Sequence, residues 1–416
     1  MAIKKIRVTN FKSFKKLEVE LGKFDVLIGA NASGKSNFIQ IFQFLRDIIE
    51  SGLENAISMQ GGVEYLRNIN IGPSENFSVE VVSDQKFTYG IRTKKGLIGV
   101  KIYGVIYGFA MKFKKRGLGF EIVKDKLTQK CKFVRLERQK EKVKEKEKLG
   151  EGEIIFSRAD SKIEINLNKP AEVLIKEDDM IPPFLREGKL PPNTLLFETP
   201  FFSLPPLREV FSDISIYDFD PKLPKKAIPI TGKAELEEDG SNLSIVLKNI
   251  IGYKDKKRKF FNLISELLPF VDKLDVEKFA DKSLLFTLRE KYFEKQYLPA
   301  SLISDGTINI TALITALYFE EKLLTIIEEP ERNIHPYLIS KVIEMMKDTS
   351  QKKQIIATTH NPEMVKYAGL ENILLVTRDK EGFSTISRPA DKEEVKTFLK
   401  NEIGVEELYV QNLLEV

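Results

Sequence analysis

Two glycines, a lysine and a serine lie close together near the start of the chain, in Gly29-Ala-Asn-Ala-Ser-Gly-Lys-Ser36. Their spacing fits the phosphate-loop pattern, in which successive backbone N–H groups wrap a triphosphate. In that pattern Lys35 reaches the β and γ phosphates and the Ser36 hydroxyl binds magnesium, so Lys35 is also a catalytic candidate. The expected nucleotide contacts are Gly29, Ala30, Asn31, Ala32, Ser33, Gly34, Lys35, Ser36 and Asn37.

Two adjacent carboxylates end an apolar run in Leu323-Leu-Thr-Ile-Ile-Glu-Glu-Pro330. Because successive strand residues point to opposite sides, Glu328 and Glu329 can take different roles at the tip of a strand. We expect Glu328 to hold the magnesium shell and Glu329 to orient and deprotonate an attacking water.

A histidine ends a second apolar run, Gln354-Ile-Ile-Ala-Thr-Thr-His360. Ligands of open parallel sheets collect at the C-terminal ends of the strands. His360 is therefore a third catalytic candidate, and a structural histidine is the alternative.

The segment Ser304-Asp-Gly-Thr307 directly precedes an apolar helical run, residues 308–317. Ser304 and Asp305 can cap that helix, which is also what any capped helix needs. The position of the segment before the carboxylate strand favours a nucleotide-binding role for Ser304, Asp305 and Gly306.

A strand, a loop and a helix are needed to present the phosphate loop, and all three are predicted. Residues 26–28 are aliphatic enough for a buried strand, and apolar residues recur at helical spacing after the loop, at Phe38, Ile39, Phe42 and Leu45. An antiparallel ribbon of two strands, near residues 3–9 and 17–21, is expected before this unit.

A β-rich region follows, with strands expected near residues 77–82, 87–92, 107–112 and 119–123 and a hairpin at 154–167. Within it, residues 135–148 alternate in charge sign and offer almost nothing to bury, which predicts a solvated helix or a loop, with a nucleic-acid tail as the alternative. A proline-rich passage then leads to Asp239-Gly-Ser-Asn-Leu243, the expected start of a helix that ends near Ile251.

Composition gives only broad limits. Lys and Arg total 66 against 61 Asp and Glu, and the net charge of +5 is too mild to identify a polyanionic partner. The single cysteine, Cys131, excludes a disulfide framework within one chain and fits a reducing cytosol. No stretch reaches the ~18 apolar residues of a membrane helix, so we expect a cytoplasmic protein with no membrane partner.

With these motifs in order, the chain resembles the ABC-type ATPase heads of the SMC and RecF superfamily, and most closely the stand-alone ATPases related to the overcoming-lysogenization-defect (OLD) proteins. In this resemblance residues 29–36 are the Walker A loop and Ser304-Asp-Gly-Thr307 is the signature motif. Ile327-Glu-Glu-Pro-Glu331 and Ile334-His-Pro336 resemble Walker B and the D-loop, and Thr358-Thr-His-Asn-Pro362 resembles the switch-histidine segment. Asn10-Phe-Lys-Ser-Phe14 is also similar, which adds Lys12 to the expected nucleotide contacts.

The resemblance implies an α/β fold, an ABC-type P-loop ATPase with mixed sheets and an inserted β-rich arm. The expected division is an N-terminal lobe at 1–85, the arm with its charged loop at 86–230, and a C-terminal lobe at 231–416. ATP and Mg²⁺ are the implied cofactors. The implied active unit is a homodimer formed on ATP binding, in which each Walker A loop faces Ser304 of the partner subunit.

Several features depart from the family pattern. Glu328 stands where most ABC proteins have aspartate, so both direct and water-mediated metal contact stay open. Gln60 is one candidate for the Q-loop residue, and a surface glutamine is the alternative. The segment after His360 is too short for the nuclease domain of OLD proteins, and the Asp-x-Asp pair Asp218 and Asp220 is better interpreted as part of a turn.

Two functions from different classes therefore remain. The first is an ATPase switch acting on duplex DNA, or on a separate nuclease or effector chain, in DNA maintenance, repair or anti-phage defence. The second is a nucleotide-gated scaffold or sensor with little turnover and no DNA binding. The paired carboxylates favour hydrolysis, and the basic clusters at residues 254–259 and 112–116 are candidate DNA contacts, against the alternative of solvated loops.

Overall fold

The computed structural model describes residues 3–93, 96–114, 117, 119–139, 142–180, 189–199, 206–279, 282–293, 295–400 and 404–415. The chain divides into two compact units, each assembled from separate segments. The first unit contains Met1–Leu21, Ser36–Ile214 and Thr377–Ile386, and the second contains Gly22–Lys35, Ser215–Val376 and Ser387–Val416.

The first unit is built on an eight-stranded antiparallel sheet with the order β2-β1-β4-β6-β7-β8-β9, in which β5 also pairs with β6. Its strands are β1 (Lys5–Phe11), β2 (Phe14–Glu20), β4 (Phe77–Ser83), β5 (Phe87–Thr93), β6 (Gly96–Phe113), β7 (Phe120–Gln139), β8 (Lys142–Ala159) and β9 (Lys162–Asn168). The expected ribbon at the start of the chain is confirmed by the pairing of β1 with β2.

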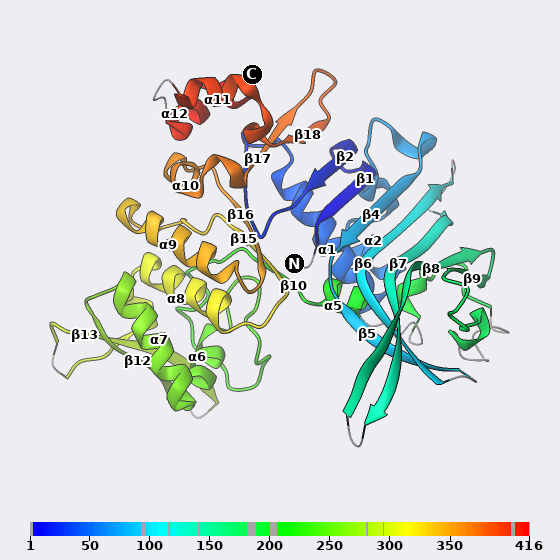
Figure 1. The fold of residues 1–416 in the computed structure, drawn as a ribbon. Helices are drawn as coiled ribbons and strands as arrows, with labels where there is room; N and C mark the ends of the chain where they lie inside the picture. The colour runs from blue at the N-terminus through cyan, green and yellow to red at the C-terminus, as the bar shows by residue number, and fades with distance from the viewer. Residues whose placement is uncertain are drawn as a thin grey trace. The chain divides into compact units, whose positions relative to one another are not determined.

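The expectation of a helix or loop at residues 135–148 is wrong for the part of this run that the structure describes. These residues belong to β7 and β8, long neighbouring strands that extend together in Figure 1. Opposite charges face one another across the strands, with Arg135 Nη1 3.1 Å from Glu147 Oε2 and Lys146 Nζ 3.1 Å from Glu137 Oε1. Such cross-strand pairs stabilise a solvated ribbon without apolar burial, which the one-dimensional charge pattern does not reveal.

Phenylalanines fill the core of the first unit where the sheet meets α1 (Lys35–Ser51). Phe11 lies 6.4 Å from Phe44 and 6.0 Å from Phe77 between ring centroids, and Phe77 lies 5.8 Å from Phe109. These rings join β1, α1, β4 and β6 into one packed layer. The remaining helices of this unit are α2 (Leu53–Met59), α3 (Val63–Leu66) and α5 (Pro206–Ser212), with 3₁₀ turns η1 (Gly72–Ser74), η2 (Glu177–Asp179) and η3 (Leu196–Glu198).

The second unit contains most of a six-stranded sheet with the order β10-β15-β16-β3-β17-β18. Its strands are β3 (Phe24–Ile28), β10 (Ile214–Tyr217), β15 (Leu324–Glu328), β16 (Gln354–Thr358), β17 (Ile373–Arg378) and β18 (Ser384–Ser387). The central pairs β15–β16, β16–β3 and β3–β17 are parallel. The predicted α/β class with mixed sheets is therefore confirmed.

Helices and a second, antiparallel sheet complete the second unit. That sheet has the order β11-β13-β12, with β14 on β13, and its strands are β11 (Ile228–Pro229), β12 (Val271–Phe279), β13 (Ser283–Glu290) and β14 (Leu298–Pro299). The helices are α6 (Leu243–Gly252), α7 (Lys254–Leu267), α8 (Asp305–Tyr318), α9 (Pro336–Thr349), α10 (Pro362–Ala368), α11 (Glu393–Lys400) and α12 (Val405–Val410), with 3₁₀ turns η4 (Ala300–Leu302), η5 (Leu370–Asn372), η6 (Pro389–Asp391) and η7 (Leu413–Glu415). Apolar side chains of β3, β15 and β16 share one buried cluster with those of α6 to α10.

Among the residues that the structure describes, no helix is both long and apolar enough to cross a membrane.

Candidate functional site

Three strand ends of the second unit meet at one edge of its parallel sheet. The register places Glu328 of β15 beside Thr358 of β16, and Thr358 beside Leu27 of β3. Because the three strands run in the same direction, the residues that follow them emerge together. The phosphate loop, Glu329 and His360 are those residues.

Gly29 begins the phosphate loop in a conformation that a side chain would not tolerate. Its φ is +149°, and a Cβ atom there would lie 2.3 Å from the carbonyl oxygen of Val376 in β17. The first glycine of the motif is therefore required by the neighbouring strand as well as by the loop.

Lys35 lies over its own loop. Its ammonium donates hydrogen bonds to the carbonyls of Gly29 at 2.8 Å and Ala30 at 3.0 Å. Burial lowers the pKa of Lys35, while the carboxylates Glu329 and Glu328 oppose that shift. A cation held among carbonyls beside two carboxylates is placed to exchange these oxygens for phosphate oxygens.

Glu329 is held in a left-handed backbone conformation at the tip of β15, with φ +44°. Its N–H donates to the carbonyl of Thr358 at 3.1 Å, which fixes the turn. Non-glycine residues in this region are strained and are often found at functional sites. Burial, followed by the charges of Asp218 and Glu329, raises the pKa of Glu328 to about 7.

His360 joins the lysine to the second carboxylate. Its Nδ1 lies 3.5 Å from Lys35 Nζ, and its Nε2 lies 3.7 Å from Glu329 Oε1. Burial and the Lys35 charge lower the pKa of His360, which favours the neutral imidazole. The structure thus brings together the three expected catalytic side chains, Lys35, His360 and Glu329.

The signature segment caps α8, as its sequence predicts. Ser304 Oγ accepts a hydrogen bond from the Thr307 N–H at 3.3 Å, and its side chain is exposed. Asp305 Oδ1 lies 2.5 Å from Lys225 Nζ. A Cβ atom on Gly306 would lie 2.5 Å from the Asn333 carbonyl oxygen, so this glycine allows α8 to approach the segment after Glu329.

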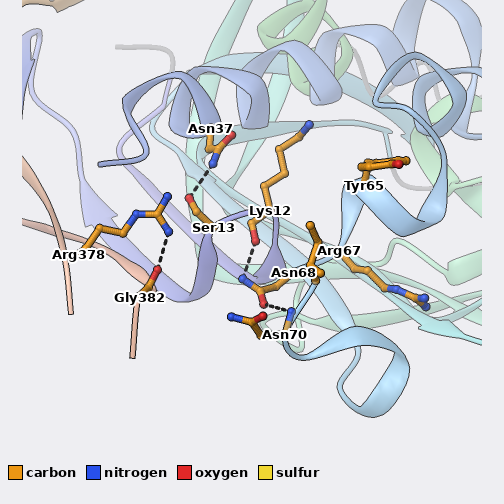
Figure 2. A pocket seen from close by; sticks show the side chains of 10 residues that line it. Lys12, Ser13, Asn37, Tyr65, Arg67, Asn68, Asn70, Arg378 and Gly382 are labelled. Carbon is orange, nitrogen blue, oxygen red and sulfur yellow. Dashed lines mark hydrogen bonds between the residues drawn. The ribbon is translucent and has the colours of Figure 1, made fainter. Parts of the chain in front are cut away.

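Lys12 and Asn37, two further expected contacts, line one pocket of about 420 Å³ in the first unit (Figure 2). Asn37 Nδ2 donates to Ser13 Oγ at 2.8 Å, and Asn68 Nδ2 donates to the Lys12 carbonyl at 2.6 Å. Burial lowers the pKa of Lys12. Arg67 and Arg378 also line this pocket, which gives it a basic character suited to an anion.

The candidate Q-loop residue, Gln60, is buried at the C-terminal end of α2. Of the basic clusters, residues 254–259 form the exposed first turns of α7. Residues 115 and 116 of the other cluster lie outside the described residues.

Three side chains at the strand tips were not assigned a role from the sequence. Arg332 Nη1 donates to Asp218 Oδ1 at 2.8 Å, and Arg332 Nη2 donates to Glu329 Oε2 at 3.1 Å. Thr359 Oγ1 donates to Glu331, and burial raises the pKa of Glu331 to about 7. The turn expected after Asp218 is present, since Asp220 Oδ1 accepts from the Lys222 N–H at 2.9 Å, but that turn also places Asp218 beside Arg332.

The residues present fit a magnesium ion that is shared with a nucleotide. Among the described residues, no group of three or more His, Cys, Asp or Glu side chains could hold a metal alone. Mg²⁺ in nucleotide sites uses one or two protein ligands together with phosphate oxygens and waters. Burial, followed by the charges of Asp218 and Glu329, raises the pKa of Glu328, and a bound cation would favour its carboxylate form.

Comparison with known proteins gives one curated relative and several solved structures. The Septu protein PtuA of Bacillus mycoides (strain KBAB4) is 28% identical over 111 residues, which cover 24% of this chain and only 16% of that protein. The SMC head bound to the C-winged helix domain of ScpA is 15% identical with a TM-score of 0.49, covering 92% of this chain and 97% of that chain. The SMC head domain from Thermotoga maritima is also 15% identical, with a TM-score of 0.42, covering 93% of this chain and 99% of that chain.

A family model described as "AAA domain, putative AbiEii toxin, Type IV TA system" matches residues 25–179 and 183–366, which is more than half of the chain. The match includes the phosphate loop, the signature segment, both carboxylates and His360. The chain therefore belongs to this family of AAA-domain proteins.

Proposed function

We propose that this chain is an ATPase that hydrolyses ATP at a site completed by a second copy of itself. The observation that carries the proposal is the line of side chains from Lys35 through His360 to Glu329, at 3.5 and 3.7 Å. A phosphate-binding cation and a general base lie on the two sides of one imidazole. That arrangement matches the needs of phosphoryl transfer, which are positioning and charge stabilisation.

Each side chain then has a distinct task. Lys35 releases the carbonyls of its own loop and binds the β and γ phosphates. The Glu329 carboxylate accepts a proton from the attacking water, and His360 is placed to contact the γ phosphate. Magnesium, which Ser36 and Glu328 would hold, neutralises phosphate charge when bound.

The signature segment supports the proposed dimer. Ser304 is exposed at the N-terminus of α8, where free N–H groups and the helix dipole attract anions. In the proposed dimer this end faces the γ phosphate held by the other subunit. The proposed assembly is of the ABC type that the motifs resemble.

We place this cycle in anti-phage defence, with a separate effector chain as its client. The family description, which names a toxin of a toxin–antitoxin system, and the Septu relative both favour defence over DNA maintenance. We also propose that the chain is related to the OLD proteins and that it binds duplex DNA. Both proposals rest on the motifs and on the exposed basic turns of α7.

Steady-state hydrolysis and nucleotide binding, measured on the same variants, test this function. Glu329→Gln should keep ATP affinity and lose turnover by ~10²–10⁴-fold, because only the proton acceptor is removed. Lys35→Ala should lose binding itself. The matched control is Glu344→Gln on the exposed surface of α9, which should behave as wild type.

Full turnover in Glu329→Gln would contradict the assignment of the base. A wild-type protein that binds ATP with no hydrolysis would favour the nucleotide-gated scaffold instead.

A further inference from the structure

The Arg332 guanidinium donates hydrogen bonds from all three of its nitrogens, to two carboxylates and one carbonyl. Its Nε and Nη2 donate to Glu329 Oε2 at 3.3 and 3.1 Å. Its Nη1 donates to Asp218 Oδ1 at 2.8 Å and to the Phe219 carbonyl at 3.3 Å. We propose that Arg332 is a positioning residue for the general base Glu329, and that Asp218 helps to hold Arg332 in place.

This inference rests on the proposed function, in which Glu329 accepts the proton of the attacking water. The Glu329 side chain is 37% exposed at a strand tip, and its backbone is fixed through the bond to Thr358. A glutamate side chain in such a place has several rotamers open to it. The Arg332 fork binds Oε2, and this leaves Oε1 directed at His360.

Arg332 can serve this purpose because its own backbone is fixed. Its N–H donates to the Glu329 carbonyl at 2.9 Å, and its carbonyl accepts from Asn309 Nδ2 at 2.6 Å. Asn309 is a buried residue of α8, the helix that Ser304 caps. The backbone of Arg332 is therefore held from α8, and its guanidinium is held by Asp218.

Lysine could not reproduce this arrangement. A guanidinium presents its donors in a rigid planar fork, whereas an ammonium is a point charge on a flexible stem. The contacts of Arg332 to Glu329 come from two nitrogens of that fork, and the third nitrogen faces away toward Asp218. A single ammonium at this position could not reproduce the contacts to both carboxylates.

The test compares kcat and KM for ATP in Arg332→Ala, Arg332→Lys, Asp218→Asn and the double variant Arg332→Ala with Asp218→Asn. Arg332→Ala should lower kcat by ~10–100-fold, with KM within about twofold, because misplacing a reacting group affects the chemical step. Arg332→Lys should recover only part of that loss. Asp218→Asn should lower kcat several-fold in the wild-type background and should have a clearly smaller effect once Arg332 is absent, because only the charge of Asp218 near Glu328 is then removed.

Arg289→Ala is the matched control. Arg289 Nε donates to Asp272 Oδ2 at 2.8 Å in the β12–β13 sheet, so this variant breaks another Arg–Asp pair of the same unit. Its kcat should equal that of wild type.

An unchanged kcat in Arg332→Ala would overturn the inference, as would an equal effect of Asp218→Asn with and without Arg332. If Arg332→Ala does not fold, the contrast between Arg332→Lys and Asp218→Asn decides, and wild-type kcat in both overturns the inference. Turnover that survives in Glu329→Gln overturns the proposed function and this inference together. Turnover that is lost in Glu329→Gln but kept in Arg332→Ala overturns this inference alone.

Discussion

Replacing Gly29 with alanine tests whether the neighbouring strand requires the first glycine of the phosphate loop. The added Cβ would lie 2.3 Å from the Val376 carbonyl oxygen and 2.9 Å from Ser33 Oγ. The first of these atoms belongs to the backbone of β17, which pairs with β3. The Val376 carbonyl oxygen can therefore move only if the pairing of β17 with β3 shifts.

Two costs add at this position. Alanine at φ +149° is strained by ~1–3 kcal/mol. Forcing a methyl group into a packed site costs a further ~1–3 kcal/mol. Together they predict a loss of ~2–6 kcal/mol, a large part of the ~5–15 kcal/mol that typical domains have.

Urea unfolding followed by circular dichroism measures this loss, since the chain has no tryptophan to report by fluorescence. Two controls separate the costs. Gly62→Ala, at φ +91° with no atom within 4 Å of its Cβ, should lose only the ~1–3 kcal/mol of strain. Gly252→Ala, which meets no atom within 4 Å at the end of α6, should change the free energy of unfolding by less than ~0.5 kcal/mol. A Gly29→Ala protein as stable as Gly252→Ala would refute the steric reasoning.

Three further predictions concern the signature segment, the basic helix and pH. Ser304→Arg should abolish turnover and leave ATP affinity nearly intact, because in the proposed dimer Ser304 faces the nucleotide of the other subunit. Equal losses of affinity in Ser304→Arg and Lys35→Ala, measured by titration calorimetry, would argue against that dimer. Duplex DNA should bind weakly, without sequence preference and more tightly with ATP, and replacing Lys256, Lys257 and Arg258 by alanine should weaken this binding. Titrations of labelled duplex at several salt concentrations check this, and no binding at ~50 mM salt would argue for a protein client. The free energy of unfolding of the nucleotide-free chain should fall as pH rises from about 5 to about 7. Burial raises the pKa of both Glu331 and Glu328 to about 7, so each keeps a proton in the folded state that the unfolded chain has already lost. Glu331→Gln should make this slope shallower in urea unfolding at each pH, and an unchanged slope would count against a buried protonated carboxyl at Glu331.

The strand, loop and helix around Lys35 could be predicted because their signals are local. The apolar run of β3, the glycines and the helical spacing after them each lie within a few residues of the loop. The parallel neighbours β15 and β16 followed from similar runs, and the rule for parallel sheets placed Glu329 and His360 at one edge. Local periodicity combined with one topological rule was therefore sufficient for these parts of the site.

The rest of the site depends on contacts between distant residues. Asp218 and Arg332 are separated by 114 positions, and nothing near Asp218 indicates an arginine partner. The prediction for the charged part of β7 and β8 was wrong for a related reason, because the stability of these strands comes from pairing across the sheet. An alternating charge pattern is the same whether its partners lie on one helix or on the next strand.

In the proposed cycle ATP joins two copies of this chain and hydrolysis separates them. Light scattering of Glu329→Gln measures this directly, because the mass reports the dimer. ATP with magnesium should double the mass of Glu329→Gln, and the dimer should persist, whereas Lys35→Ala should keep its nucleotide-free mass under the same conditions. A Glu329→Gln protein that stays monomeric at saturating ATP would contradict the composite site.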